Sequence, residues 1–221
     1  MNKRLGSIAL GFYFLFLWTQ IASSQTLFRG YPDLKKDGAI VFYLQTDSTR
    51  IALLQKHGDT LNAQKINQKA TQFNKKLVAA FRKSFSFCPV YFIYADHIDA
   101  FIEHKSSPFF LDDSLQFNPH IQVREKNIIY ASVLHDYIYG KNGSPVTVTT
   151  VDMICLQDSA RKPLAWPFPY YTELYTDFLL FPKKIEYYPR LLQNKLEIWY
   201  YYPSKRTVRI LKKMGKWENA E

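Results

Sequence analysis

The sequence predicts an α/β domain: a single-domain sandwich with a mixed sheet, in which a β-α-β unit is followed by a hairpin and a C-terminal helix. Two continuous apolar runs, 39–46 and 90–95, flank a stretch in which apolar residues recur every three or four positions. This is the pattern of two buried strands joined by an amphipathic helix. Two further β-prone runs, 128–134 and 146–156, enclose an Asn-Gly turn signal and predict the hairpin. A chain of 221 residues, 47% hydrophobic and 22% charged, is neither disordered nor fibrous.

The chain begins with the pattern of an export signal. Two basic residues precede the uncharged stretch 5–28, and its first part, 8–18, is densely apolar. Ala22 and Ser24 then fit the small residues of a cleavage site, which predicts a signal peptide over 1–24. The alternative is an uncleaved anchor helix, which would be the chain's only attachment to a membrane. No cysteine lies near the cleavage site, and this excludes the common bacterial lipoprotein anchor.

Cleavage would leave one α/β domain over 25–204 and a charged tail over 205–221. The mature chain has 27 Lys and Arg against 19 Asp and Glu, a net charge of +8 over 197 residues. We expect it to be exported to a periplasmic or extracellular location. Nucleic acid is therefore a poor partner, despite the basic composition.

The first half of the domain contains the β-α-β unit. Strand 39–46 leads to a short helix, for which Asp47-Ser48 offers an N-cap and Gly58 a stop. A long helix follows, with Asp59 or Thr60 as its cap. Its apolar positions form one continuous stripe: Ile66, Ala70, Phe73, Leu77, Phe81 and Phe85. Its opposite face is basic: Lys65, Lys69, Lys75, Lys76, Arg82 and Lys83.

The second half is less regular outside the hairpin. Asp96 ends the second strand and precedes a short helix that reaches His104. The polar segment 105–126 is expected to be a loop, and 163–171, rich in proline and aromatic rings, to be extended. Residues 185–200 are expected to form the final helix.

The resulting order β, α, β, (α), β, β, α is also that of a thioredoxin-like fold, an analogy of topology alone. The chain has no Cys-x-x-Cys, so a redox role of that kind is not supported. Segments 74–81, 87–92 and 167–171 resemble uncharacterised exported bacterial proteins, and the resemblance extends over about half of the chain. It implies export and a single domain, with no activity or functional residue attached.

Three signatures of catalysis and nucleotide binding are absent: G-x-x-x-x-G-K-[ST], G-x-S-x-G and H-E-x-x-H. We therefore expect no cofactor. The best polar constellation is Asp96-His97 together with His135-Asp136, because each pair directly follows a predicted strand. These four residues could hold a divalent metal or supply a general base, as in a metal-assisted hydrolase.

That constellation has a structural alternative. Asp96 is well placed to cap the short helix, and the other pair can simply end its strand. If strands 90–95 and 128–134 run antiparallel, the two pairs lie at opposite edges of the sheet and form no site.

The basic helix face is the first candidate binding surface. Four of its residues could meet anionic lipid, envelope polysaccharide or an acidic partner: Lys65, Lys69, Lys76 and Lys83. The alternative is an ordinary solvated outer face, weakened by salt screening.

Late aromatic residues form the second candidate surface. Rings with a polar handle are common at binding surfaces, and the candidates here are Trp166, Tyr170, Trp199 and Tyr201. The alternative is core packing of the final helix. The four adjacent rings at 199–202 cannot all point inward on one helix, so some exposure is expected.

The two cysteines, Cys88 and Cys155, allow two interpretations. In an oxidising compartment they could form a disulfide; otherwise they are two buried free thiols.

These patterns predict an exported, non-catalytic domain that binds a cell-envelope component or a partner protein through basic and aromatic surfaces. The alternative is the metal-assisted hydrolase.

Overall fold

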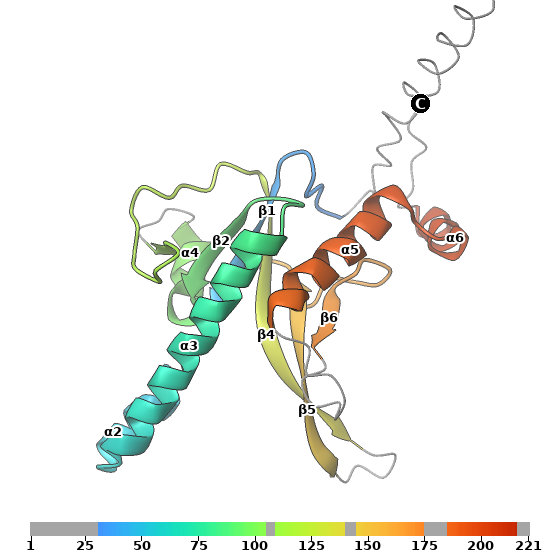
Figure 1. Ribbon diagram of the computed structural model, residues 1–221. Helices are drawn as coiled ribbons and strands as arrows, with labels where there is room; N and C mark the ends of the chain where they lie inside the picture. The colour runs from blue at the N-terminus through green and yellow to red at the C-terminus, as the bar shows by residue number, and fades with distance from the viewer. Residues whose placement is uncertain (1–30, 105–108, 140–144, 175–184, 216–221) are drawn as a thin grey trace, which may run out of the picture. The chain divides into compact units, whose positions relative to one another are not determined.

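A computed structural model describes residues 31–104, 109–139, 145–174 and 185–215 (Figure 1). The predicted signal peptide and the tip of the predicted hairpin lie outside these ranges. No helix in the described ranges is long and apolar enough to cross a membrane. Contacts divide the chain into two compact units, one of which is Tyr31–Trp199.

The Tyr31–Trp199 unit is built on a mixed six-stranded sheet, which confirms the predicted α/β class. Its strands are β1 (Gly38–Leu44), β2 (Val90–Tyr94), β3 (Phe110–Leu111), β4 (Asn127–Tyr139), β5 (Pro145–Gln157) and β6 (Tyr171–Leu174). The α-helices are α2 (Ser48–Lys56), α3 (Thr60–Ser84), α4 (Ile98–His104) and α5 (Tyr188–Tyr201). The short 3-10 turns are η1 (Ala95–His97) and η2 (Ile185–Tyr187). The strand order is β3-β2-β1-β4-β5-β6. β1 is parallel to both of its neighbours, β2 and β4, and the other neighbouring strands are antiparallel to each other.

The predicted β-α-β unit is present as β1, α3 and β2. Ile40 pairs with Val90 and Leu44 with Tyr94, so the two strands run in the same direction with α3 between them in sequence. The observed order adds two short strands, β3 and β6, which the prediction lacked. β4 and β5 are also longer than the runs that predicted them.

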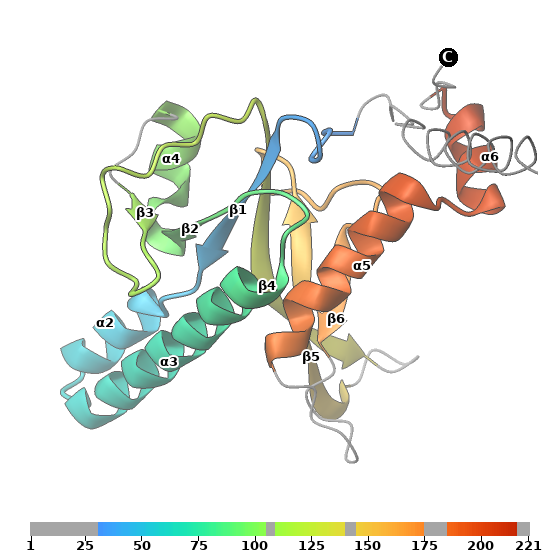
Figure 2. The same cartoon turned by 45° about the horizontal axis from the view of Figure 1, so that its top comes forward.

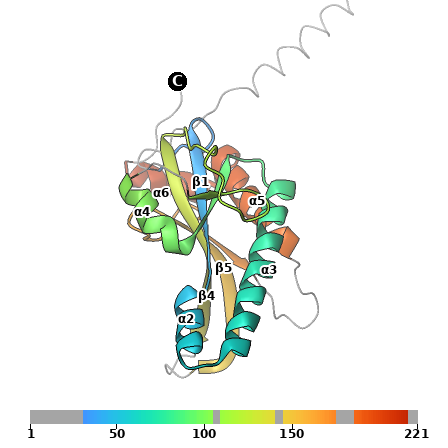
Figure 3. The same ribbon diagram turned by 90° about the vertical axis from the view of Figure 1, so that its left-hand side faces the viewer.

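Helix α3 packs on one face of the sheet, where α5 lies as well, while α4 lies on the other face (Figures 2 and 3). Asp59 caps α3 as expected, because its side chain accepts a hydrogen bond from the main-chain N–H of Asn62. Phe81 of α3 packs against Phe42 and Phe92, with ring centroids 5.1 and 5.9 Å apart. These three buried rings form the centre of this layer, because aromatic pairs at such distances add to the burial of apolar area.

The opposite face of the sheet has its own core beneath α4. Val41 and Tyr43 alternate with the residues that face α3, as the period of a strand requires. The buried members of this second cluster are Val41, Tyr43, Ile93, Ile98, Phe101, Phe110 and Tyr130. The sheet is thus buried on both faces, which explains why β1 reads as a continuous apolar run.

The apolar stripe of α3 is buried only in its second half. Leu77 and Phe81 are buried, whereas Ile66, Ala70 and Phe73 are half-buried. Figure 1 shows the reason: the first half of α3, with α2, lies beyond the end of β1. The stripe therefore continues past the sheet that covers it.

The two cysteines are free and buried, so the disulfide alternative is not formed. Cys88 lies two residues before β2, whereas Cys155 lies in β5, and β1 and β4 lie between these strands. Three strand spacings are roughly 14 Å, which is beyond the reach of a disulfide. Burial raises the pKa of the Cys88 thiol to about 12 and also raises the pKa of Cys155.

The second unit includes Tyr200–Gly215 among its described residues. The expected charged tail is not entirely irregular, because it contains helix α6 (Lys205–Lys213). Ser204 caps this helix by accepting a hydrogen bond from Thr207 N–H at 3.1 Å. The cap and the spacing of Val208 and Leu211 explain why a strongly basic segment is helical here.

Candidate functional site

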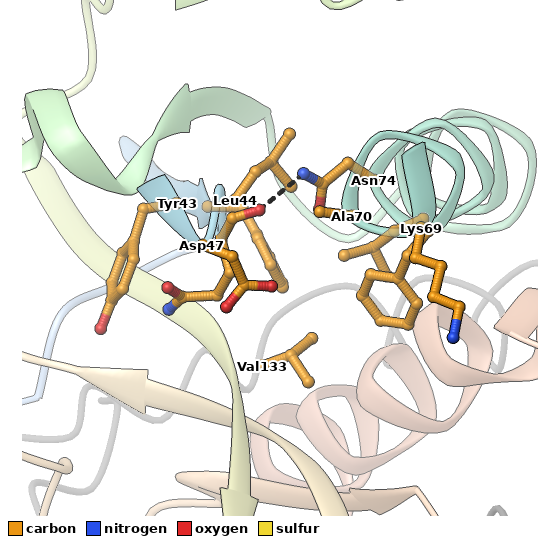
Figure 4. A pocket seen from close by; sticks show the side chains of 11 residues that line it. Tyr43, Leu44, Asp47, Lys69, Ala70, Asn74 and Val133 are labelled. Atoms are coloured by element: carbon orange, nitrogen blue, oxygen red, sulfur yellow. Dashed lines mark hydrogen bonds between the residues drawn. The ribbon is translucent and has the colours of Figure 1, made fainter. Parts of the chain in front are cut away.

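A hollow of about 240 Å³ lies where β1 ends beside α3 and β4; we call it the β1 hollow (Figure 4). Apolar side chains from three elements form its walls: Phe42, Leu44, Ala70, Phe73, Leu77 and Val133. It sits at the carboxyl end of β1, which has parallel neighbours on both sides, and α/β sheets commonly bind ligands at such strand ends. The unburied part of the α3 stripe thus borders this hollow.

Asn74 fixes one wall of the β1 hollow. It is a buried polar residue in the middle of α3, only 3% exposed. Its side-chain amide donates a hydrogen bond of 2.9 Å to the main-chain carbonyl of Gln45, drawn as the dashed line in Figure 4. This bond joins the end of β1 to α3, so the hollow has a defined shape.

Two charged residues of opposite sign line the same hollow, Asp47 and Lys69. Figure 4 shows Asp47 beside the end of β1 and Lys69 on α3. Neither side chain forms an ion pair or hydrogen bond with another described residue, and they are not paired with each other. The β1 hollow therefore combines apolar walls with two free charges.

The position of Asp47 differs from the prediction. It occupies the N-cap position of α2, but its backbone is left-handed, with φ 53° and ψ 23°, and its side chain makes no cap hydrogen bond. Gly58 does end α2 with a positive φ of 78°, as expected.

A second hollow, of about 610 Å³, lies farther along α3, between this helix and the start of α5. Lys76 and Lys83 line it together with Glu186, and its apolar walls include Tyr188. Phe73 lines both hollows, so they are neighbours on one side of α3.

The four predicted binding lysines of α3 form one row, which we call the lysine row: Lys65, Lys69, Lys76 and Lys83. Their spacing of four, seven and seven residues keeps them within about 40° around the helix axis. All four are exposed, and none forms an ion pair with another residue in the described ranges. Helix α3 contains no acidic residue, so nothing on it neutralises the row. The row borders both hollows.

The structure places the two halves of the predicted metal constellation at the same edge of the sheet. β2 and β4 are both parallel to β1, so the antiparallel arrangement that would have separated the pairs does not occur. β1 still lies between them, which puts the two strands roughly 10 Å apart. The side chains of His135 and Asp136 are outside the described part of the structure.

The other half of that constellation is engaged in structural contacts. The Asp96 carboxylate accepts hydrogen bonds from the hydroxyls of Thr46 at 2.8 Å and Ser48 at 2.9 Å, and it does not cap the following helix. His97 stacks on Phe109, with ring centroids 5.2 Å apart. Among the described residues, no group of three or more His, Cys, Asp or Glu could hold a metal ion. These contacts do not assemble a metal centre.

The structure buries part of the predicted aromatic surface and leaves the rest exposed. Trp199 is 5% exposed and packs edge-on against Phe168 and Tyr31, so its prediction as a surface residue is wrong. Its ring therefore belongs to a buried aromatic cluster rather than to a surface. Tyr170 is half-buried, while Trp166 and Tyr201 are exposed, at 54% and 48%. Some exposure along 199–202 was expected and is observed.

Three residues of the β1 hollow were not predicted from the sequence as lining residues: Asp47, Phe73 and Asn74. A polar Asn within the α3 stripe was the available signal, because a buried polar group needs a partner. Nothing in the sequence indicates the left-handed backbone of Asp47.

No family model, curated protein or solved structure matches this chain. The fold and the site define an α/β domain with a basic helix along two hollows, and function must be argued from that geometry.

Proposed function

We propose that this chain is an exported, non-catalytic binding domain that holds an anionic component of the cell envelope along the lysine row. The observation that supports it is the row itself: four exposed ammonium groups, none paired with another described residue, on one side of a helix without acidic residues. A lysine row of this kind attracts negative charge, with about 1 kcal/mol per lysine near an anionic surface.

The shape of the row favours an extended anion over a compact one. Lys65 and Lys83 are 18 positions apart on a straight run of helix, which corresponds to about 27 Å. A flat lipid surface or an envelope polysaccharide presents negative charges over such a length, and a small ion does not. An acidic partner protein is the other ligand that would use the same row.

Sedimentation with anionic vesicles tests the proposal. The purified protein is mixed with vesicles of phosphatidylglycerol and phosphatidylcholine, with phosphatidylcholine vesicles alone, and with isolated envelope fractions, each over a salt series. We expect binding to the anionic vesicles and the envelope fractions, and we expect it to weaken as salt rises. Binding to envelope fractions but not to anionic vesicles would instead indicate a protein or polysaccharide partner.

A charge-matched pair of variants separates the row from net charge. Lys69→Glu with Lys76→Glu should weaken vesicle binding by at least roughly thirtyfold, because two lysines contribute about 2 kcal/mol and the new carboxylates add repulsion. Lys56→Glu with Lys75→Glu makes the same change in charge at exposed residues outside the row. Equal loss in both variants, or no binding at any salt concentration, would contradict the proposal.

A further inference from the structure

The β1 hollow has the size and walls of a site for one small apolar group. A volume of about 240 Å³ corresponds to roughly eight water molecules at about 30 Å³ each. Its walls are provided by Phe42, Phe73, Leu77 and Val133, with the small Ala70 leaving room between them. This is smaller than a typical drug-sized pocket, and it has room for a branched side chain of the size of leucine.

Asp47 and Lys69 lie on different sides of the hollow, Asp47 beside the end of β1 and Lys69 on α3 (Figure 4). Among the described lining residues, Asp47 and Lys69 are the only charged ones; both are exposed, and neither is paired within that part of the chain. A purely anionic ligand would be attracted by Lys69 and repelled by Asp47, and a cation would face the reverse. A ligand that carries both an ammonium and a carboxylate satisfies both side chains.

The backbone of Asp47 is a second observation in favour of a ligand. An aspartate at an N-cap position ordinarily accepts a hydrogen bond from its own helix. Here the left-handed backbone, φ 53°, leaves the carboxylate without that bond and beside the hollow. Aspartate adopts the left-handed region more readily than most residues, so this backbone places the carboxylate at the hollow without large strain.

We propose that the β1 hollow binds a zwitterionic amino acid with an apolar side chain. Asp47 accepts hydrogen bonds from its ammonium group, Lys69 donates to its carboxylate, and the apolar walls hold its side chain. The Asn74–Gln45 hydrogen bond keeps the end of β1 and α3 at the spacing that this ligand requires. The inference goes beyond the proposed function and shares only Lys69 with it.

Calorimetric titration with three related probes tests the chemistry. L-leucine carries both charges, isocaproate lacks the ammonium, and isoamylamine lacks the carboxylate. We expect L-leucine to bind with a dissociation constant of about 0.1 mM. Each analogue should bind roughly tenfold more weakly, because each loses one charge-assisted hydrogen bond.

Two conservative variants assign each charge to its partner. Asp47→Asn should weaken L-leucine and isoamylamine roughly tenfold and leave isocaproate unchanged or tighter. Asparagine tolerates a left-handed backbone, so the loop is preserved. Lys69→Gln should weaken L-leucine and isocaproate and leave isoamylamine unchanged. Ala70→Leu, which narrows the hollow, should weaken binding of all three.

Lys83→Gln is the control that separates the two proposals. Lys83 belongs to the lysine row but does not line the β1 hollow. This variant should weaken vesicle binding and leave L-leucine binding unchanged. Three outcomes would each overturn the inference, whatever the vesicles show. They are absence of L-leucine binding up to about 10 mM, isocaproate binding as tight as that of L-leucine, and unchanged affinities in the Asp47→Asn variant.

Discussion

The side-chain amide of Asn74 donates a hydrogen bond of 2.9 Å to the main-chain carbonyl of Gln45. Asn74 is the only buried polar residue of α3, and Gln45 directly follows β1. The bond satisfies a carbonyl at the point where the strand ends, beside the β1 hollow. It therefore links the ligand site to the stability of the helix–sheet contact.

We expect Asn74→Ala to lower the free energy of unfolding by about 1 to 3 kcal/mol, because the Gln45 carbonyl loses its donor. Urea unfolding followed by circular dichroism measures this. Gln72→Ala, at an exposed position of the same helix, should change stability by less than about 0.5 kcal/mol. Equal stability of the Asn74 variant and wild type would show that the bond contributes nothing.

Two buried hydroxyls, those of Ser132 and Thr172, have no hydrogen-bond partner in the described structure. Replacing them with apolar groups of similar shape removes a desolvation penalty. We expect Ser132→Ala and Thr172→Val to leave stability unchanged or to raise it by about 1 kcal/mol. Thermal unfolding of each variant gives the answer.

Tyr43 supplies the contrast for those two variants. Its buried hydroxyl donates a hydrogen bond of 2.5 Å to the side-chain carbonyl of Gln157. Tyr43→Phe should therefore lower stability by about 1 to 2 kcal/mol, opposite in sign to Ser132→Ala. The same sign for both would argue against the hydrogen-bond assignment.

His97 is expected to stabilise the fold without binding metal. His97→Ala removes ring contacts with Phe109 at 5.2 Å and Phe117 at 5.4 Å and should cost about 1 to 2 kcal/mol. His97→Phe should restore most of this. Zinc titration of both variants should match wild type, and stoichiometric zinc that disappears with the histidine would revive the hydrolase alternative.

The buried thiol of Cys88 predicts a loss of stability at alkaline pH. Burial raises its pKa from 9.0 to about 12, so the unfolded chain releases this proton at lower pH than the folded one. Stability from this group is complete below pH 9 and declines as pH rises toward 12, by at most about 1.4 kcal/mol per pH unit. Urea unfolding at several pH values measures the slope, and Cys88→Ala should make it shallower. An unchanged slope would mean that other groups cause the loss of stability at alkaline pH. Tyr91 is one such group, because burial also raises its pKa.

The elements with strong periodic patterns were predictable from the sequence. The apolar stripe of α3 and the runs of β1 and β2 identified the β-α-β unit, since burial on both sides of a sheet produces continuous apolar strands. The lysine row was predictable for the same reason: spacing alone places its members on one side of a helix.

The hollows depend on where elements end relative to one another, which periodicity does not specify. The stripe of α3 continues to Ile66 with the same spacing, although β1 ends before it is covered. Trp199 shows a second limit. Four adjacent aromatic residues must divide between core and surface, but which ring points inward depends on how α5 is rotated over the sheet.

The parallel pairing of β1 has a consequence for how this chain folds. Ile40 pairs with Val90, 50 positions later, and also with Ile129, 89 positions later. Helix α3 and the β4–β5 pair use local contacts and can form early, whereas β1 must wait for the closure of both long loops. During synthesis β1 is made first of all the strands and acquires its second neighbour only after β4 has emerged. β1, whose seven residues are all buried in the folded domain, is thus exposed longest, and we expect its protection until β4 arrives to influence the yield of native protein.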